Sequence, residues 1–294
     1  MIRYLVLALL IFPAIAFSCK SFGEITAFKT LDSGGSGKFK AIAASESGLP
    51  GYVFYQPKNI GEAVAQEHGL PVVIFANGGC NDTSFPFERM LSEIASHGYL
   101  VIALGAMQNR LDDRPLKKAA NEMMTEALDW IGRASQTKGG RYFSSVDMNN
   151  VAFAGQSCGG AQVLAVASDP RVKTYLMFNS GIGDMTMAKA DRQSLNALHG
   201  PILYLVGGDS DVATDNAKLD YQRINHVPVA FANLPGGGHS GTFEEPLGGS
   251  FTRVALKWLD WHLNGKDANA STFLKRDLAG FDDWEIKAKR FSGT

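Results

Sequence analysis

Hydrophobic residues in this chain form short uninterrupted runs, separated by segments in which they recur at helical spacing. The runs are "LPVVIFANGG" (70–79), "YLVIALG" (99–105), "NVAFAG" (150–155), "RVKTYLMFNSG" (171–181), "PILYLVGG" (201–208) and "VPVAFANL" (227–234). Continuous apolar runs of this length are typical of strands that are buried on both faces of a parallel sheet. A further strand is predicted at "GYVFYQP" (51–57), where apolar and polar residues alternate.

The segments between these runs predict helices. The apolar residues of 85–98 fall on one helical face, and Gly98 ends the pattern; a long helix is predicted over 114–135, opened by Pro115. Shorter helical patterns follow the run at 150–155 and cover 216–224, and the last helix is predicted at 250–265. Apolar strands separated by helices predict an α/β fold in which helices cover both faces of a mostly parallel sheet.

The N-terminus, "MIRYLVLALLIFPAIAFSCK", carries one arginine and then an apolar run that is too short, and too interrupted by Pro13, to span a bilayer. This pattern predicts a secretory signal peptide at 1–18, cleaved near 16–18. Cleavage after Ala16 fits the small-x-small rule, whereas cleavage after Ser18 would leave Cys19 at the new N-terminus and allow a lipid anchor. We therefore expect a secreted or periplasmic protein, with an uncleaved membrane anchor as the alternative.

Composition limits the remaining classes of function. The chain has 294 residues, of which 45% are hydrophobic, so 19–294 can bury one large core as a single domain. Its 28 basic and 29 acidic residues leave a net charge of -1, which gives no field to attract nucleic acid or an anionic membrane. No His or Cys pair has metal-ligand spacing. We expect a monomer that acts on small or neutral molecules without a metal or cofactor.

Polar side chains collect where the predicted parallel strands end, which is where open α/β sheets bind their ligands. Ser157 follows the run at 150–155, and Asn77–Cys80 follow the run at 70–76. Asp209 and Asp211 follow the run that ends at Gly208, and His239 follows the last run and three glycines. The other histidines stand at helix ends, in the last helix or in loops. The sequence therefore predicts a serine, an acid and a histidine at one edge of the sheet.

The stretch "GQSCG" (155–159) matches the G-x-S-x-G nucleophile elbow. In this motif the serine occupies a strained turn between a strand and a helix, and the flanking glycines avoid collisions with neighbouring backbone. Here a predicted strand precedes Ser157 and a predicted helix follows it. The order Ser, Asp, His along the chain is also the order in which the fold that carries this elbow supplies its catalytic residues.

Several segments together resemble the α/β-hydrolase superfamily: "PVVIFANGGC", "EIASHGYLVIALG", "VAFAGQSCGG", "LVGGDSDVA" and "LPGGGHSG". The chain is most similar to the secreted branch without a lid, near dienelactone hydrolases, cutinases and bacterial polyester hydrolases, over about 39–265. The resemblance implies an eight-stranded, mainly parallel sheet and hydrolysis of carboxylic esters through an acyl-enzyme. The segment 179–200 is too short for a substantial lid; Met185 and Met187 either line the open site or pack beneath this loop.

The resemblance also implies roles for individual residues. Ser157 would attack the ester carbonyl, His239 would accept its proton, and an aspartate would orient the imidazole. Asp211 is favoured over Asp209, because the resembling enzymes place their acid just before a short apolar pair, here Val212-Ala213. The oxyanion hole would use the backbone N–H of Cys158 and that of Gly79, with Cys80 as the alternative to Gly79.

Two of the three cysteines, Cys80 and Cys158, lie in or beside the segments expected to form the oxyanion hole, whereas Cys19 lies in or just after the signal peptide. Exported proteins meet oxidising conditions. We therefore predict a Cys80–Cys158 disulfide; the alternative is two buried free thiols.

The favoured function is a secreted serine esterase for small-molecule or polymeric ester substrates. A lipase, amidase or peptidase on the same site, or a binding protein that kept the fold without catalysis, are the alternatives, because a fold does not fix its function.

Overall fold

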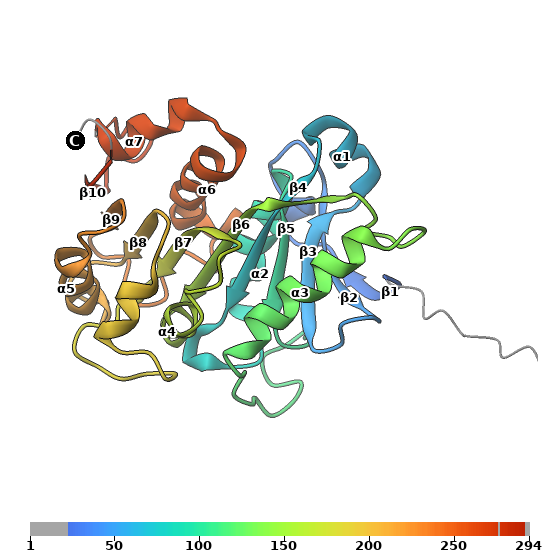
Figure 1. Cartoon of the computed structure of the whole chain (residues 1–294), viewed down its shortest axis with the longest axis horizontal. Helices are drawn as coiled ribbons and strands as arrows, with labels where there is room; N and C mark the ends of the chain where they lie inside the picture. The colour runs from blue at the N-terminus through green and yellow to red at the C-terminus, as the bar shows by residue number, and fades with distance from the viewer. Residues whose placement is uncertain (1–22, 276, 292–294) are drawn as a thin grey trace, which may run out of the picture.

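The computed structural model describes residues 23–275 and 277–291, and its strands form one mixed sheet (Figure 1). The predicted signal peptide and Cys19 lie outside the described residues. The strand order is β1-β2-β3-β5-β4-β6-β7-β8-β9-β10. The strands are β1 (Ile25–Lys29), β2 (Ala41–Glu46), β3 (Tyr52–Pro57), β4 (Leu70–Ala76), β5 (Leu100–Leu104), β6 (Val146–Gln156), β7 (Val172–Phe178), β8 (Ile202–Val206), β9 (Val229–Asn233) and β10 (Glu285–Lys289).

Strands β4 to β9 pair in parallel, as the apolar runs predicted, and β1, β2, β3 and β10 add antiparallel strands. The expected number of eight strands is wrong, because the sheet has ten. Both edge strands, β1 and β10, lie outside the segment covered by the resemblance. They are short, pair on one side only and carry lysines and a glutamate among their residues. Such edge strands leave little hydrophobic pattern in the sequence.

Helices cover both faces of the sheet, as predicted. On one face lie α1 (Ile60–Glu67), α3 (Glu122–Gln136), α4 (Cys158–Ala165) and α5 (Thr214–Arg223); on the other lie α2 (Glu88–Ser96), α6 (Gly249–Asn264) and α7 (Ala270–Leu274). Each face of the sheet has its own hydrophobic core. Because side chains alternate along a strand, Val72 and Ile74 of β4 point into the core under α3 and α4, and Val73 and Phe75 point into the core under α2 and α6. Figure 1 shows α3 and α4 in front of the strands.

The helix predicted from Pro115 begins only at Glu122. The residues before it pair with the loop after β4: the N–H of Ala119 donates to the carbonyl of Cys80 at 2.8 Å, and the N–H of Asp82 donates to the carbonyl of Lys117 at 2.9 Å. Backbone groups that bond across to another segment are not free for the helical ladder. Because of these hydrogen bonds, α3 starts later in the chain than predicted. They also place residues 115–121 beside the loop after β4, which forms part of the candidate site.

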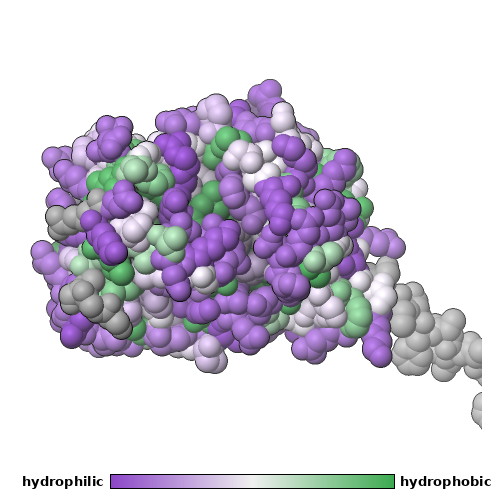
Figure 2. Space-filling view, turned by 90° about the horizontal axis from the view of Figure 1, so that it is seen from above, coloured by the Kyte–Doolittle hydropathy of each residue, from purple (hydrophilic) through white to green (hydrophobic). Residues whose placement is uncertain are grey.

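Within the described ranges, no helix is both long and apolar enough to cross a membrane. The face of the molecule seen in Figure 2 is mainly hydrophilic, with hydrophobic residues in small separate groups.

Candidate active site

Ser157 lies in a sharp turn between the end of β6 and the start of α4. Its backbone has φ 53° and ψ -120°, a conformation that non-glycine residues seldom adopt. The turn is crowded: a Cβ added at Gly155 would lie 2.4 Å from the backbone of Gly159, and one at Gly159 would lie 2.2 Å from the carbonyl oxygen of Ala76. The two glycines therefore allow β6, α4 and β4 to approach closely, which is the geometry that the motif predicts.

The structure brings Ser157, His239 and Asp211 together. The Nε2 atom of His239 lies 2.9 Å from the Oγ atom of Ser157, and its Nδ1 atom lies 2.7 Å from Oδ1 of Asp211. The three residues follow β6, β9 and β8, so the parallel strands deliver them to one edge of the sheet. The carboxylate of Asp211 is buried, whereas the His239 side chain keeps 35% of its surface exposed. A hydroxyl, an imidazole and a carboxylate thus form one continuous hydrogen-bonded chain at the edge of the sheet.

Asp211 is held as a carboxylate by its surroundings. Besides His239, it accepts hydrogen bonds from the N–H groups of Gly207 and Ala213, both at 3.0 Å, and from Nδ2 of Asn179 at 2.8 Å. Burial opposes ionisation of Asp211, but these hydrogen bonds outweigh it, so that its pKa lies below the ordinary value. Asp211 can therefore orient the imidazole as an anion at neutral pH.

Asp209, the alternative acid, lies elsewhere. It lines a separate cavity of about 910 Å³ together with Lys218 and Trp284. Both aspartates follow β8, and only the turn between them decides which one reaches the histidine. Asp211, and not Asp209, is the aspartate that hydrogen-bonds to His239.

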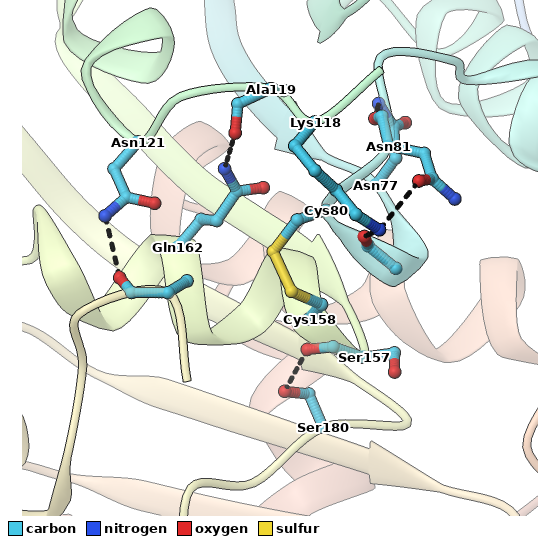
Figure 3. Close-up of a disulfide and its surroundings, with 12 residues drawn as sticks. Asn77, Cys80, Asn81, Lys118, Ala119, Asn121, Ser157, Cys158, Gln162 and Ser180 are labelled. Carbon is cyan, nitrogen blue, oxygen red and sulfur yellow. Dashed lines mark hydrogen bonds between the residues drawn. A yellow bond between two sulfur atoms is a disulfide. The ribbon is translucent and has the colours of Figure 1, made fainter. Parts of the chain in front are cut away.

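A disulfide joins Cys80 and Cys158, with their Cα atoms 5.0 Å apart, and confirms the predicted pairing. It connects the loop after β4 to the first residue of α4, next to Ser157 (Figure 3). The N–H of Cys80 already donates to the carbonyl of Asn77 at 3.1 Å. Of the two candidate donors on this loop, Cys80 therefore has its N–H engaged within the loop. Cys158 opens α4, where N–H groups have no partner within the helix.

The loop that carries Gly79 is fastened by residues 115–121. The ammonium group of Lys118 donates to the carbonyl of Gly79 at 2.6 Å and to Oδ1 of Asn81 at 3.1 Å. Behind them, the Nε2 atom of the buried Gln162 on α4 donates to the carbonyl of Ala119 at 2.8 Å. These bonds and the disulfide hold the loop against α4 from two sides (Figure 3).

A model of one protein family, described as PETase, PET hydrolase-like, matches residues 33–280. This chain belongs to the PET hydrolase-like family. The match confirms the resemblance to the bacterial polyester hydrolases and the α/β-hydrolase fold, and it supports a hydrolase that acts on esters. No curated protein matches the chain.

Two further polar residues lie at this PET hydrolase-like site and were not predicted from the sequence. Gln156, the residue before the serine, is buried, and its Nε2 donates to the carbonyl of His239 at 3.0 Å. Asn179 donates both to Asp211 and, at 2.9 Å, to the carbonyl of Gly238. Gln156 occupies the variable position of the motif and Asn179 follows β7, so their places at strand ends were the signals that could have identified them.

The cavity at Ser157 also contains aromatic residues that the sequence did not assign to it. This cavity, which we call the Ser157 cavity, measures about 240 Å³ and is lined by Ser157 and His239 together with Gly79, Phe87 and Phe243, among others. Met185 and Met187 do not line it: Met185 is 40% exposed, and Met187 packs against the core. The interpretation that they line the site is therefore wrong for this cavity.

Several of the other histidines have structural partners. His262 packs between Trp258 and Trp261, with ring centroids 4.2 Å from each, and its burial lowers its pKa to about 3. His97 contacts Glu93 at the end of α2, and His199 contacts Tyr175 and the carbonyl of Val172. Among the residues that the structure describes, no group of three or more His, Cys, Asp or Glu side chains is placed to hold a metal ion.

Proposed function

We propose that this protein is a secreted serine esterase that cleaves carboxylic esters through an acyl-enzyme on Ser157. The observation that carries the proposal is the continuous hydrogen-bond chain from Asp211 through His239 to the Ser157 hydroxyl. Membership of an ester-hydrolysing family supports the same reaction class.

In the proposed reaction, the Ser157 hydroxyl attacks the ester carbonyl while Nε2 of His239 accepts its proton. The N–H groups of Gly79 and Cys158 stabilise the charge that develops on the carbonyl oxygen. His239 then donates the proton to the leaving alcohol, and Asp211 stabilises the imidazolium throughout. Water activated by His239 finally hydrolyses the acyl-enzyme and restores the serine.

Secretion is part of the proposal. A disulfide is typical of proteins that leave the reducing cytosol, and the predicted signal peptide at 1–18 agrees with export. The single domain at 19–294, the monomeric state and a lipid anchor at Cys19 stay predictions.

The wild-type protein is expected to hydrolyse 4-nitrophenyl butyrate and to leave the matched 4-nitroanilide nearly untouched. The ester rate should fall in acid, where His239 can no longer accept the serine proton, and should stay high into the alkaline range, where the base is free. The lowered pKa of Asp211 keeps its carboxylate ionised further into acid, so Asp211 should not be the group that sets this fall. Initial rates on the ester and on the anilide, measured between pH 4 and pH 10, test the substrate preference and the pH dependence. Faster anilide turnover would favour the amidase alternative, and a rate that peaks in acid would indicate a carboxylate mechanism.

Asp211→Asn is expected to lower kcat by about 10³- to 10⁴-fold, because an amide cannot hold His239 in the tautomer that accepts the serine proton. Asp209→Asn is the matched control on the same turn and should change kcat by less than about threefold, since Asp209 lines a different cavity. Steady-state kinetics of the two variants on one ester compare them directly. A larger loss from Asp209→Asn would mean that the acid is assigned to the wrong residue.

A further inference from the structure

The side chain of Gln156 contacts two loops that carry proposed catalytic groups. Its Nε2 atom donates to the carbonyl of His239 at 3.0 Å. Its Oε1 atom lies against Gly78, because a Cβ added at Gly78 would be 2.2 Å from this oxygen. Gly78 directly precedes Gly79, the proposed oxyanion donor. One amide group thus contacts both the histidine loop and the loop after β4.

Gln156 is itself held at the centre of the sheet. It is the last residue of β6, which pairs with β4 on one side and with β7 on the other, and only 5% of its surface is exposed. A side chain packed in this way has little room to change its rotamer. The amide is therefore a rigid point from which a more flexible loop can be positioned.

The loop that carries His239 depends on contacts from outside. Residues 236–238 are three glycines, and two of them have a positive φ. Glycines allow many backbone conformations, so other contacts must select one of them. Nδ2 of Asn179 donates to the carbonyl of Gly238 at 2.9 Å, and Gln156 donates to the next carbonyl along the chain. Two amides from strand ends thus fix the backbone from which the imidazole projects.

We propose that Gln156 is a positioning residue, which sets the distance between His239 and the loop that carries Gly79. This inference rests on the proposed esterase function. His239 must reach the Ser157 hydroxyl while the oxyanion lies within reach of the Gly79 N–H, so both loops must keep their places around the serine. A displacement of about 1 Å at such a site can lower the rate by about 100-fold.

The position of Gln156 also accounts for the glycine at position 78. Gly78 does not have a positive φ, so its backbone conformation is open to alanine. The atoms nearest to an added Cβ are Oε1 and Cδ of Gln156, at 2.2 and 3.4 Å, followed by a ring carbon of Phe87 at 3.6 Å. An alanine methyl would therefore displace the Gln156 amide, and this displacement would break its hydrogen bond to His239.

The first test is Gln156→Met, which keeps the length of the side chain but cannot donate a hydrogen bond. We expect kcat for 4-nitrophenyl butyrate to fall by about 10- to 100-fold while KM stays within about threefold, because the lost contact positions catalytic groups and does not bind the substrate. Gln108→Met is the matched control. Gln108 is also buried, and its Nε2 donates to the carbonyl of Arg110 at 3.3 Å, away from the Ser157 cavity, so its loss should leave kcat within about twofold of wild type.

The second test is a double-variant cycle with Gly78→Ala and Gln156→Ala. Alone, Gly78→Ala should lower kcat by about 10- to 100-fold. In the Gln156→Ala background there is no amide to displace, so Gly78→Ala should lower kcat further by less than about threefold. Gly61→Ala is the matched control: an added Cβ there meets only Asn59, at 3.7 Å, on the exposed side of α1, and kcat should stay at the wild-type value.

Different outcomes decide on the inference and on the function beneath it. If the wild type hydrolyses no carboxylic ester, the proposed function fails and the inference falls with it. If the wild type is active, the inference is wrong when Gln156→Met keeps the wild-type kcat, with or without a rise in KM. It is also wrong when the losses from Gly78→Ala and Gln156→Ala multiply in the double variant.

A crystal structure of Gly78→Ala keeps the test independent of any folding defect in the Gln156 variants, because Gln156 is intact in this protein. The structure should show the Gln156 amide displaced, with its Nε2 atom beyond hydrogen-bond distance of the His239 carbonyl. An amide that keeps its place beside the new methyl group, together with a wild-type kcat, would overturn the assignment.

Discussion

Replacing Ser157 with alanine is expected to reduce kcat for ester hydrolysis by about 10⁴- to 10⁶-fold, because residues that act as one catalytic unit lose nearly everything when the nucleophile is removed. The fold should persist, since alanine can occupy the same turn and its N–H can still donate to the carbonyl of Phe178. Steady-state kinetics and a thermal melt check both statements.

Ser210→Ala is the matched control for this change. Ser210 also lies on a loop after a parallel strand, but it lines the cavity of Asp209 and not the Ser157 cavity. Its loss should leave kcat within about twofold of wild type. If Ser157→Ala keeps a tenth of the wild-type rate with a normal melt, Ser157 is not the nucleophile.

Removal of the disulfide, by changing Cys80 and Cys158 together to serine, is expected to lower the free energy of unfolding by about 4 kcal/mol. The bond closes a loop of 78 residues, and chain entropy gives a bridge across such a loop this order of stabilisation. Activity should also fall, because the bond holds the Gly79 loop against α4. Urea unfolding and ester kinetics of the oxidised wild type and the double variant measure these effects.

The bonds from Lys118 and Gln162 should preserve part of the activity in the double variant, since they hold the same loop independently. Reductant serves as the control: it should lower the melting temperature of the wild type and leave the double variant unchanged. If both thiols of the unreduced, denatured wild type react with a maleimide, the pair does not form in the protein.

The central fold could be predicted from the sequence because its strands are buried on both faces. Short, continuous apolar runs that are bounded by turn residues and separated by helical patterns are typical of such buried strands. The edge strands could not be found in this way. In β10, Glu285, Lys287 and Lys289 alternate with smaller apolar residues, and the pairing with β9 is what makes this segment a strand.

The start of α3 was misplaced for a related reason. Pro115 suits the first position of a helix and the residues after it have acceptable helical propensity. Lys117 and Ala119 instead pair with Asp82 and Cys80, in a loop more than thirty residues earlier in the chain. Local preference is a weak guide where tertiary hydrogen bonds compete. The same pairing holds the loop that carries Gly79, so the contact between 115–121 and this loop was not predicted either.

Part of the candidate site could be predicted from the sequence, because several of its residues directly follow parallel strands. Ser157 and His239 follow parallel strands, and the glycines around Ser157 reveal the tight turn. Gln156 and Asn179 were not found, because their positions at strand ends were the only signal and the amide side chain itself does not indicate which partners it binds. Both amides bond to the loop that ends at His239, and Asn179 also bonds to Asp211.

The most direct test of the central claim is to locate the residue that a fluorophosphonate modifies. The reagent should form one adduct per molecule, and mass spectrometry of the digested protein should find it on Ser157 within the peptide that spans β6 and α4. Ser157→Ala treated in parallel should remain unmodified. An adduct on any other residue, or labelling that persists in Ser157→Ala, would contradict the assignment of Ser157 as the nucleophile.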